Sequence, residues 1–340
     1  MQLSIPARVL ASCLASILLI AVLWVLRLQA VVVPDNAPQL ASEVHAVARD
    51  RLLSATIIGM SLGAAGVLLR TATRNPLADP EITGVNSGAA FGAVTATALL
   101  GTNAGVVLPG ALAGACVAAA ITVGVGLGMS SGDASGAGAI QRMVLLGIAI
   151  SALFSALTSI VLVLDEAQLS TVLSWLSGRL GGVRMGDIWP SMVAVAVVVP
   201  LAFVAARGFD LLGAGDATAA SVGARPRIMR VTAVIFAVLL VAPAVAAAGP
   251  IGFLGLMSAV VAERLAGPRH RFLLILAPLI GAAVLLVADA IAQALWAPAE
   301  TPVGVVTSLA GVPLLLWGIN RLGTRQRSRS RLVNRRREVV

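Results

Sequence analysis

Charged side chains are scarce in this chain of 340 residues, because Asp, Glu, Lys and Arg together make up only 11% of it. A soluble domain carries about a quarter of its residues as charged groups. Apolar residues account for 59%, and the mean hydropathy is +0.98. They gather in runs of roughly 17–25 residues, the length with which a helix crosses a bilayer core. The composition excludes a soluble enzyme and predicts an all-α membrane protein, since a helix satisfies its own backbone hydrogen bonds in lipid.

Metal-ligating side chains are also rare, with two cysteines and two histidines in the whole chain. Cys13 and Cys116 each lie inside an apolar run, which is typical of small buried hydrophobes rather than of a disulfide. His45 and His270 are far apart and lie outside the runs. We therefore expect no metal site.

The apolar runs predict a polytopic protein with about ten transmembrane helices in one domain, residues 1–322, followed by a basic cytoplasmic tail, residues 323–340. The spans are placed near residues 8–33, 52–69, 82–101, 105–128, 141–164, 188–206, 228–248, 251–266, 271–295 and 303–320. The first run exceeds the roughly 7–15 apolar residues of a signal peptide, so we interpret it as an uncleaved span. The eighth is short and rich in glycine.

All 24 basic residues of the chain other than histidine are arginines. Their distribution predicts the topology, because positively charged residues favour cytoplasmic loops. An even number of spans with both termini in the cytoplasm puts 19 arginines inside and 5 outside. Those inside are Arg8, Arg70, Arg74, Arg142, Arg207, Arg225, Arg227, Arg230, Arg264, Arg269, Arg271, Arg321, Arg325, Arg327, Arg329, Arg331, Arg335, Arg336 and Arg337; those outside are Arg27, Arg49, Arg51, Arg179 and Arg184. This partition explains the net charge of +9 without nucleic acid. The tail has no interleaved aromatics for stacking on bases, and we expect it to face lipid headgroups.

Of the 15 carboxylates, only Asp289 lies well inside a predicted span. A charge at that depth is costly unless it has partners within the bundle. One such group is too few for a proton relay or for paired-carboxylate catalysis. We expect Asp289 to have a structural role, in which it accepts hydrogen bonds from a neighbouring helix or caps a break.

Small and hydroxyl residues recur at helical spacing in three of the spans. Glycines of the second and third spans, namely Gly59, Gly63, Gly66, Gly84, Gly88 and Gly92, allow close contact between helices. A stripe of hydroxyl residues follows one face of the fifth span, at Ser151, Ser155, Thr158 and Ser159. These hydroxyls either line a polar translocation path or bond to the carbonyl four residues back in their own helix.

The longest predicted cytoplasmic loop between spans runs from Gly208 to Arg227. Asp216 is a candidate N-cap for a short helix over residues 217–222, and Gly223 is a candidate C′ residue that ends it. A short helix held between two spans would suit the docking of a cytoplasmic partner.

Four separated blocks of this chain resemble the iron-siderophore and vitamin B12 type (FecCD-like) permeases of bacterial ABC importers. The most specific is R-N-P-L-A-x-P, formed by Arg74, Asn75, Pro76, Leu77, Ala78 and Pro80, followed by G-V-x-x-G-A from Gly84. The loop LLGAGDATAASVGA is similar to the family's coupling segment, and GPIGFLGL from Gly249 and PVGVVT from Pro302 follow in order. The resemblance covers about residues 8–322 and implies a type II importer fold.

That resemblance implies a permease subunit in the plasma membrane, without a nucleotide site of its own. Its partners would be a second permease, a cytoplasmic ATPase dimer that binds ATP and Mg²⁺, and an extracytoplasmic substrate-binding protein. The segment implied to contact the ATPase comprises Gly213, Asp216, Ala217, Ser221, Val222 and Gly223. The implied cargo is a ferric siderophore, with cobalamin or haem as the alternative.

Several positions depart from the family pattern. Ala259, Val260 and Glu263 stand where Pro-His-x-x-Arg is usual, with Arg264 one step late. Arg269 replaces an Asp, Arg70 a Gln, and Gln293 an Arg. In a homodimer, Arg70 would face its own copy near the symmetry axis, which is costly in a low-dielectric environment. We therefore expect a heterodimer in which a non-identical permease supplies carboxylates.

The sequence disfavours two other classes of function. An ion-coupled secondary carrier would place more ionisable groups near the middle of the membrane, and the docking loop would have no role in it. A membrane-embedded hydrolase or transferase would need a nucleophile and a base at suitable spacing, which the sequence does not offer.

Overall fold

The chain folds as a bundle of helices in the computed structural model, which describes residues 5–31, 38–79, 83–101, 104–128, 137–164, 169–295 and 301–313. No strand occurs within these ranges. The helices are α1 (Ile5–Gln29), a 3-10 turn η1 (Pro38–Leu40), α2 (Ala41–Thr73), α3 (Val85–Leu100), α4 (Ala104–Gly128), α5 (Ala137–Leu164), α6 (Leu169–Leu176), α7 (Met185–Ala214), α8 (Asp216–Ser221), α9 (Pro226–Ala248), α10 (Leu254–Ala266) and α11 (His270–Leu295), with a further helix over Val303–Pro313.

Seven helices in the described part of the chain are long and apolar enough to cross a membrane, namely α1, α2, α4, α5, α7, α9 and α11. Three predicted spans correspond to shorter helices: α3, α10 and Val303–Pro313. Conversely, α2 and α7 extend beyond the predicted 52–69 and 188–206. A helix continues past its apolar run wherever polar residues still favour it, so hydropathy locates a span better than it locates the ends of a helix. The basic tail, 323–340, lies outside the described residues.

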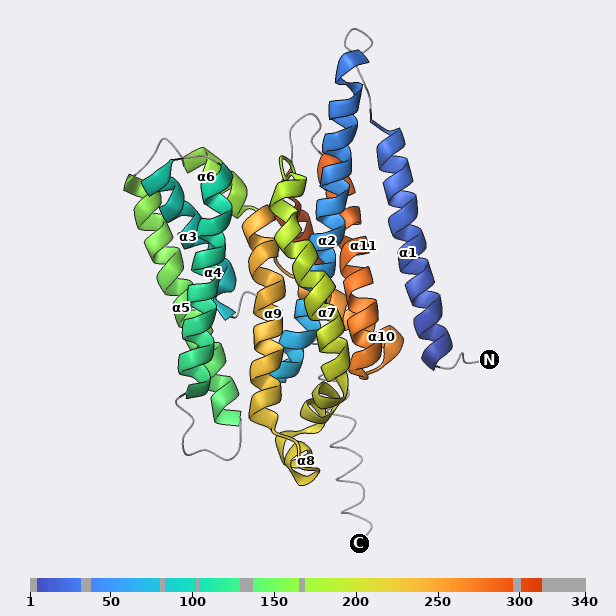
Figure 1. The fold of residues 1–340 in the computed structure, drawn as a ribbon, viewed down its shortest axis with the longest axis vertical. Coiled ribbons are helices and arrows are strands. Elements are labelled where there is room, and N and C mark those ends of the chain that lie inside the picture. The colour runs from blue at the N-terminus through green and yellow to red at the C-terminus, as the bar shows by residue number, and fades with distance from the viewer. Residues whose placement is uncertain are drawn as a thin grey trace.

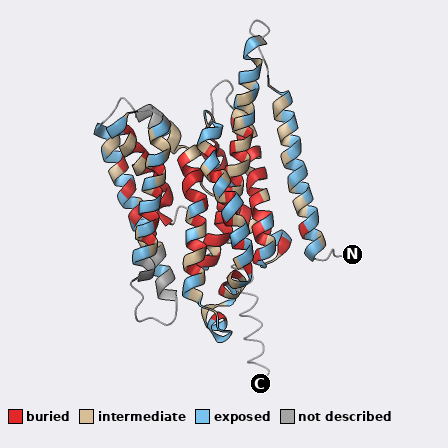
Figure 2. Ribbon diagram, viewed as in Figure 1, coloured by how far each residue is buried: buried red, intermediate tan, exposed pale blue. Residues whose placement is uncertain are grey.

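The buried core surrounds α2, which packs against α7, α9, α10 and α11 (Figure 2). In contrast, α1 stands at one edge and α3, α4 and α5 form a group at the other (Figure 1). Most apolar side chains of α1 and α5 are exposed on the single chain, as expected of helices that face lipid or a second subunit. Cys116 on α4 is likewise exposed, so the prediction that it is buried was wrong. An apolar run does not distinguish a lipid-facing side from a core-facing one.

Glycines let three pairs of helices approach closely, as the sequence predicted. A Cβ added at Gly59 would lie 2.5 Å from the carbonyl oxygen of Gly281 on α11, and one at Gly66 would lie 2.2 Å from that of Gly255 on α10. Gly88 and Gly92 contact the backbone of α4 in the same way. These contacts fix the position of α2 and of the α3–α4 pair, because no side chain separates the backbones.

Candidate functional site

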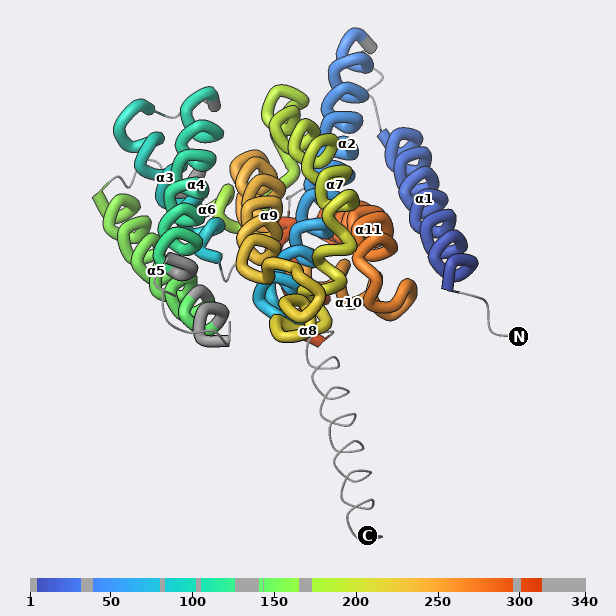
Figure 3. Tube along the Cα trace, turned by 60° about the horizontal axis from the view of Figure 1, so that its bottom comes forward, coloured from blue at the N-terminus to red at the C-terminus, as the bar shows by residue number. Residues whose placement is uncertain are grey.

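The short helix α8 projects from one end of the bundle, below α7 and α9 (Figures 1 and 3). It spans Asp216–Ser221, one residue earlier than predicted. Gly223 has φ +80°, and its N–H bonds to the Ala220 carbonyl (3.0 Å) while the Ala224 N–H bonds to that of Ala219 (3.0 Å). This pair of bonds is a Schellman motif, so the prediction of Gly223 as the C′ residue is confirmed. We call the end of the bundle that carries α8 the α8 end.

Asp216 does not cap α8, which corrects the sequence prediction. The N-cap is Gly215, with φ +126°, and no side chain caps the helix. The Asp216 carboxylate turns inward and accepts hydrogen bonds from Arg230 on α9 at 2.9 and 3.0 Å. Arg74, at the end of α2, donates to the same carboxylate. Two guanidinium groups attract a carboxylate more strongly than the backbone N–H that a cap would satisfy.

The outward surface of α8 consists of small and apolar side chains. Ala217, Ala220, Ser221 and Gly223 are exposed, and Val222 is 63% exposed. Ala219 is completely buried beneath them. Of the six residues that the resemblance implies contact a partner, Gly213 belongs to the last turn of α7 and is also exposed. Among these six residues, only Asp216 has a side chain that points away from the outward surface of α8.

The R-N-P-L-A-x-P block forms the turn after α2, directly beside α8. The Asn75 side chain accepts a hydrogen bond from the Leu77 N–H at 2.9 Å, and the Ala78 N–H bonds to the Asn75 carbonyl at 3.1 Å. Pro76 is exposed and Ala78 is buried, while Pro80 lies outside the described residues. The Asn75 side chain thus shapes the turn, as Asn commonly does.

A cavity of about 650 Å³ opens next to this turn, between the ends of α2, α7, α10 and α11. Arg70 on its wall forms an ion pair with Glu263 of α10 at 2.7 Å. Both residues occupy positions that depart from the family pattern, and each compensates for the other within one chain. The expectation that Arg70 needs a carboxylate from a second permease was therefore wrong. Its partner lies 193 residues away in the same chain, a pairing that spacing alone does not reveal.

His270 closes another side of this cavity. The Asp210 carboxylate accepts a hydrogen bond from the His270 backbone N–H at 2.8 Å and contacts its Nδ1 at 2.7 Å. The other ring nitrogen lies 2.6 Å from the Thr71 hydroxyl. This buried group ties together the ends of α2, α7 and α11. The sequence offered no periodicity that would have paired these three residues.

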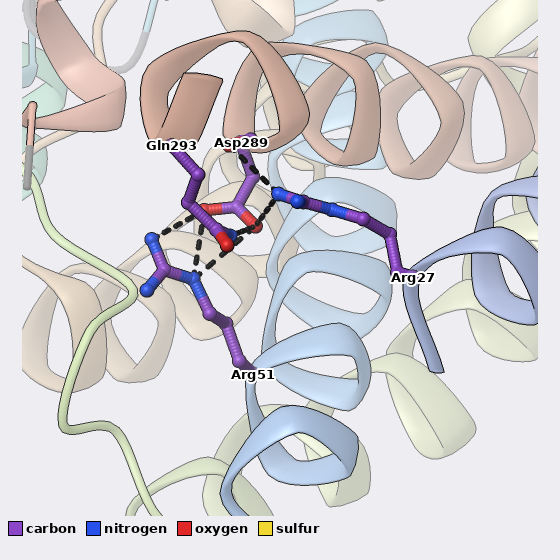
Figure 4. A network of polar contacts seen from close by, with 4 residues as sticks. All are labelled: Arg27, Arg51, Asp289 and Gln293. Atoms are coloured by element: carbon purple, nitrogen blue, oxygen red, sulfur yellow. Dashed lines mark hydrogen bonds and ion pairs between the residues drawn. The ribbon is translucent and has the colours of Figure 1, made fainter. Parts of the chain in front are cut away.

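Asp289 lies near the end of α11 that is opposite His270 and the α8 end. Its carboxylate is bonded as that of a structural residue (Figure 4). Arg51 of α2 donates to its carboxylate at 2.9 and 3.0 Å, and Gln293, one turn on, donates at 2.6 Å. Arg27 of α1 lies 3.8 Å from the same carboxylate and donates to the Asp289 carbonyl at 3.3 Å. The prediction that Asp289 accepts bonds from a neighbouring helix is confirmed. Arg51 supplies the positive charge that Gln293, which stands where the family usually has an Arg, does not carry.

Two members of the hydroxyl stripe of α5 bond within their own helix. Thr158 is buried and donates to the Phe154 carbonyl at 2.7 Å, and Ser159 donates to that of Ser155 at 3.0 Å. The Ser155 hydroxyl is exposed and lies 3.5 Å from the Ser87 hydroxyl of α3. Ser151 is half-buried. Bonding within the helix is therefore confirmed for two members, and a path along the exposed members remains a prediction.

Arg230 binds Asp216 although no motif or spacing in the sequence pointed to such a role. It is only 3% exposed and lies within the predicted span 228–248. An arginine inside an apolar run is costly without a partner. That cost was the available signal, and it would have indicated a nearby carboxylate without identifying which one.

A bundle of helices long and apolar enough to cross a membrane, with a small exposed helix at one end, is the architecture of a polytopic membrane protein. The chain belongs to the FecCD transport family, whose model matches residues 8–321. It is a permease subunit of an ABC importer and not itself an enzyme, and ATP hydrolysis is the task of a separate subunit. The earlier expectation from the sequence blocks is thereby confirmed.

Relatives that match most of the chain are named for several cargoes. The Fe(3+) dicitrate transport system permease proteins FecC and FecD of Escherichia coli (strain K12) are each 33% identical, over 85% and 80% of this chain and 87% and 83% of their own lengths. The hemin transport system permease protein HmuU of Yersinia pestis is 34% identical over 80% of this chain and 81% of its own.

A solved structure has the same arrangement of helices. A metal-chelate type ABC transporter in an inward-facing conformation matches with a TM-score of 0.79 and 26% identity, covering 91% of this chain and 98% of that one. The likeness extends over nearly the whole bundle.

Proposed function

We propose that this chain is one of two permease subunits of an ATP-driven importer that brings a ferric siderophore into the cytoplasm, and that α8 is the element through which the ATPase acts. The observation that carries the proposal is the outward surface of α8. It consists of small and apolar side chains on a short helix that ends before Gly223, and it stands at the end of the bundle next to the family's R-N-P-L block. A cleft on a partner protein can accommodate such a surface without rearrangement of the α8 side chains.

The topology follows from the same assignment. Ten spans with both termini in the cytoplasm place α8 on the cytoplasmic side, and the arginine partition of 19 to 5 supports that orientation. The first described turn of α1 lies at the same end of the bundle as α8 (Figure 1). ATP and Mg²⁺ would bind to the ATPase dimer, and a binding protein would deliver cargo at the opposite end.

A ferric siderophore is the favoured cargo because a dicitrate system, a ferric enterobactin system and an iron(3+)-hydroxamate system all give their names to relatives of this chain. A haem or cobalamin importer is the alternative, since permeases named for those cargoes are 34% and 33% identical. The exposed hydroxyls of Ser155 and Ser159 would offer weak contacts along the path, which suit the release of a large chelate.

The second permease is proposed to be a different chain. The charge argument for this no longer holds, since Arg70 pairs with Glu263 in its own chain. Support comes instead from the relatives, two of which are distinct permeases named for one dicitrate system. If this chain and the ATPase alone form a stable complex that imports the chelate at full rate, the heterodimer proposal is wrong.

The test of the docking assignment is Ala220→Arg in proteoliposomes that contain both permeases and the ATPase. Ala220 is exposed, so a bulky cation there blocks docking while the bundle stays folded. Ala219 is unsuitable because it is buried. We expect Ala220→Arg to abolish co-purification of the ATPase and Ala220→Ser, the matched control, to retain it.

Uptake of radiolabelled ferric siderophores, haem and cobalamin by the control complex identifies the cargo. Uptake of ferric chelates alone supports the siderophore assignment, and uptake of haem or cobalamin alone rejects it. Full coupling by Ala220→Arg would reject α8 as the docking element.

A further inference from the structure

α8 has a glycine with positive φ close to each of its ends, directly before it and two residues after it. Gly215 precedes it with φ +126° and Gly223 follows it with φ +80°. Glycine adopts such backbone conformations readily and, for the same reason, resists rotation weakly. A helix of six residues between two glycines would swivel under load unless side chains hold it. What holds α8 to the bundle therefore decides whether a push on it reaches the spans.

The Asp216 clamp, which we define as Asp216 with Arg74 and Arg230, provides the polar part of that attachment, beside the buried side chain of Ala219. Arg230 donates two hydrogen bonds to the Asp216 carboxylate from α9, and Arg74 donates a third from the end of α2. The clamp is charge-assisted at every contact, which makes it stronger and more directional than neutral hydrogen bonds.

The same two arginines also bind the ends of the spans. The Arg230 Nε donates to the Ala72 carbonyl of α2 at 3.0 Å, and Arg74 donates to the Leu212 carbonyl of α7 at 3.1 Å. Carbonyls in the last turn of a helix have no partner within it, and a cation there also complements the helix dipole. Each arginine is therefore fixed by a helix end on one side and by Asp216 on the other.

The backbone of Arg74 supports this reading. Arg74 is one of two residues other than glycine with positive φ in the described part of the chain, at φ 50°. That conformation is uncommon for a side chain without special tolerance of it, and it persists where surrounding contacts require it. Here it directs the guanidinium of the R-N-P-L block back toward α7 and α8.

We propose that Asp216 is the positioning residue that makes α8 move as one body with the end of α2, so that a displacement of α8 reaches the core of the bundle. This rests on the proposed function of α8 as the docking element. α2 is the natural recipient, because it packs against α7, α9, α10 and α11 through the centre of the molecule. Without the clamp, the ATPase would still bind α8, but its displacement would be absorbed by rotation at Gly215.

The test uses Asp216→Asn in the complex of both permeases with the ATPase. Asn keeps the size of the side chain and removes the charge that holds two guanidinium groups. We expect the ATPase to co-purify and to hydrolyse ATP, while the uptake of ferric chelate per ATP hydrolysed falls on the order of tenfold, as the loss of bonds between charged groups implies. Asp216→Glu, which retains the charge, should restore part of the coupling.

Two further variants separate the clamp from general stability. Arg230→Met removes the same link from the α9 side, and combining it with Asp216→Asn should reduce uptake per ATP no further than either change alone. The matched control is Arg225→Met, which removes an exposed cation near α8 that takes no part in the clamp. It should leave the ratio unchanged.

A distance measurement gives a readout that does not depend on transport. Spin labels at Pro76→Cys and Ser221→Cys, in a chain with Cys13 and Cys116 replaced by serine, should show one narrow distance that broadens with Asp216→Asn. An unchanged distance distribution together with normal uptake per ATP overturns the clamp. If Ala220→Arg also leaves transport coupled to ATP hydrolysis, the proposed docking function of α8 is wrong as well. If Ala220→Arg uncouples transport and Asp216→Asn does not, the docking assignment stands and the clamp is wrong.

Discussion

Asp289 shows what a single carboxylate requires within an apolar bundle. Its side chain is 2% exposed, yet Arg51, Arg27 and Gln293 surround it, so each of its oxygens has a partner (Figure 4). The four residues come from α1, α2 and α11, and the group joins these helices near the end opposite α8. The charge is tolerated because its partners are charged or polar and fixed.

We predict that Asp289→Asn lowers the stability of the protein by about 3 kcal/mol, because it leaves the Arg51 guanidinium without its counter-charge. The melting temperature of the detergent-solubilised protein measures the change. Arg49→Met is the control, since the Arg49 side chain is 60% exposed and its pair with Asp50 contributes less than about 1 kcal/mol. Equal melting temperatures for the two variants would show that the Asp289 group does not hold the helices together.

At the scale of helices, close backbone contact decides the packing. α2 carries Gly59, Gly63 and Gly66 at the spacing of one helical face, and each meets the backbone of α10 or α11. Apolar side chains gain little from helix association in lipid, whose tails are equally apolar. Shape therefore determines which helices pair, and glycine permits the closest approach.

We predict that Gly66→Ala prevents this approach, because the added Cβ would lie 2.2 Å from the Gly255 carbonyl oxygen. The backbones of α2 and α10 must separate, and we expect a loss of about 2 kcal/mol or more, the order typical of overpacking. Thermal unfolding in detergent measures it. Gly124→Ala on α4 meets nothing within 4 Å and should be neutral or slightly stabilising. A stable Gly66→Ala variant would contradict the described contact.

At the scale of the whole molecule, polar groups separate into two ends of the bundle. The α8 end holds the clamp, the Arg70–Glu263 pair and the His270 group, while the opposite end holds the Asp289 group. The helices between them are apolar. This division is what a protein embedded in a bilayer requires.

The topology predicts opposite accessibility for two serines. Ser221 on α8 and Ser42 at the start of α2 are both exposed, and the arginine partition puts the first in the cytoplasm and the second outside. In a chain without Cys13 and Cys116, Ser42→Cys should react with a membrane-impermeant maleimide in intact cells, and Ser221→Cys only after permeabilisation. Reaction of both before permeabilisation would reject the orientation.

The sequence by itself determined the class of protein, most of the spans, the position of α8 and its stop at Gly223. These follow from the length of apolar runs and from local backbone preferences, which a few neighbouring residues specify. Resemblance to known permeases added the family, which no run length could supply. It also implied that the loop containing α8 contacts the ATPase.

Only the tertiary structure decided the partners of the charged residues. Arg51 and Asp289 are 238 residues apart in sequence, and Arg70 and Glu263 are 193 apart. Asp216 is 142 residues from Arg74, and it binds arginines instead of capping its own helix. Hydropathy identifies the charged residues that lie in apolar runs and therefore need a counter-charge. Which counter-charge each of them contacts depends on how the helices pack. The packing depends on the shapes of the helix surfaces and above all on the close backbone contacts at glycines. These contacts form only when segments that are distant in sequence come together.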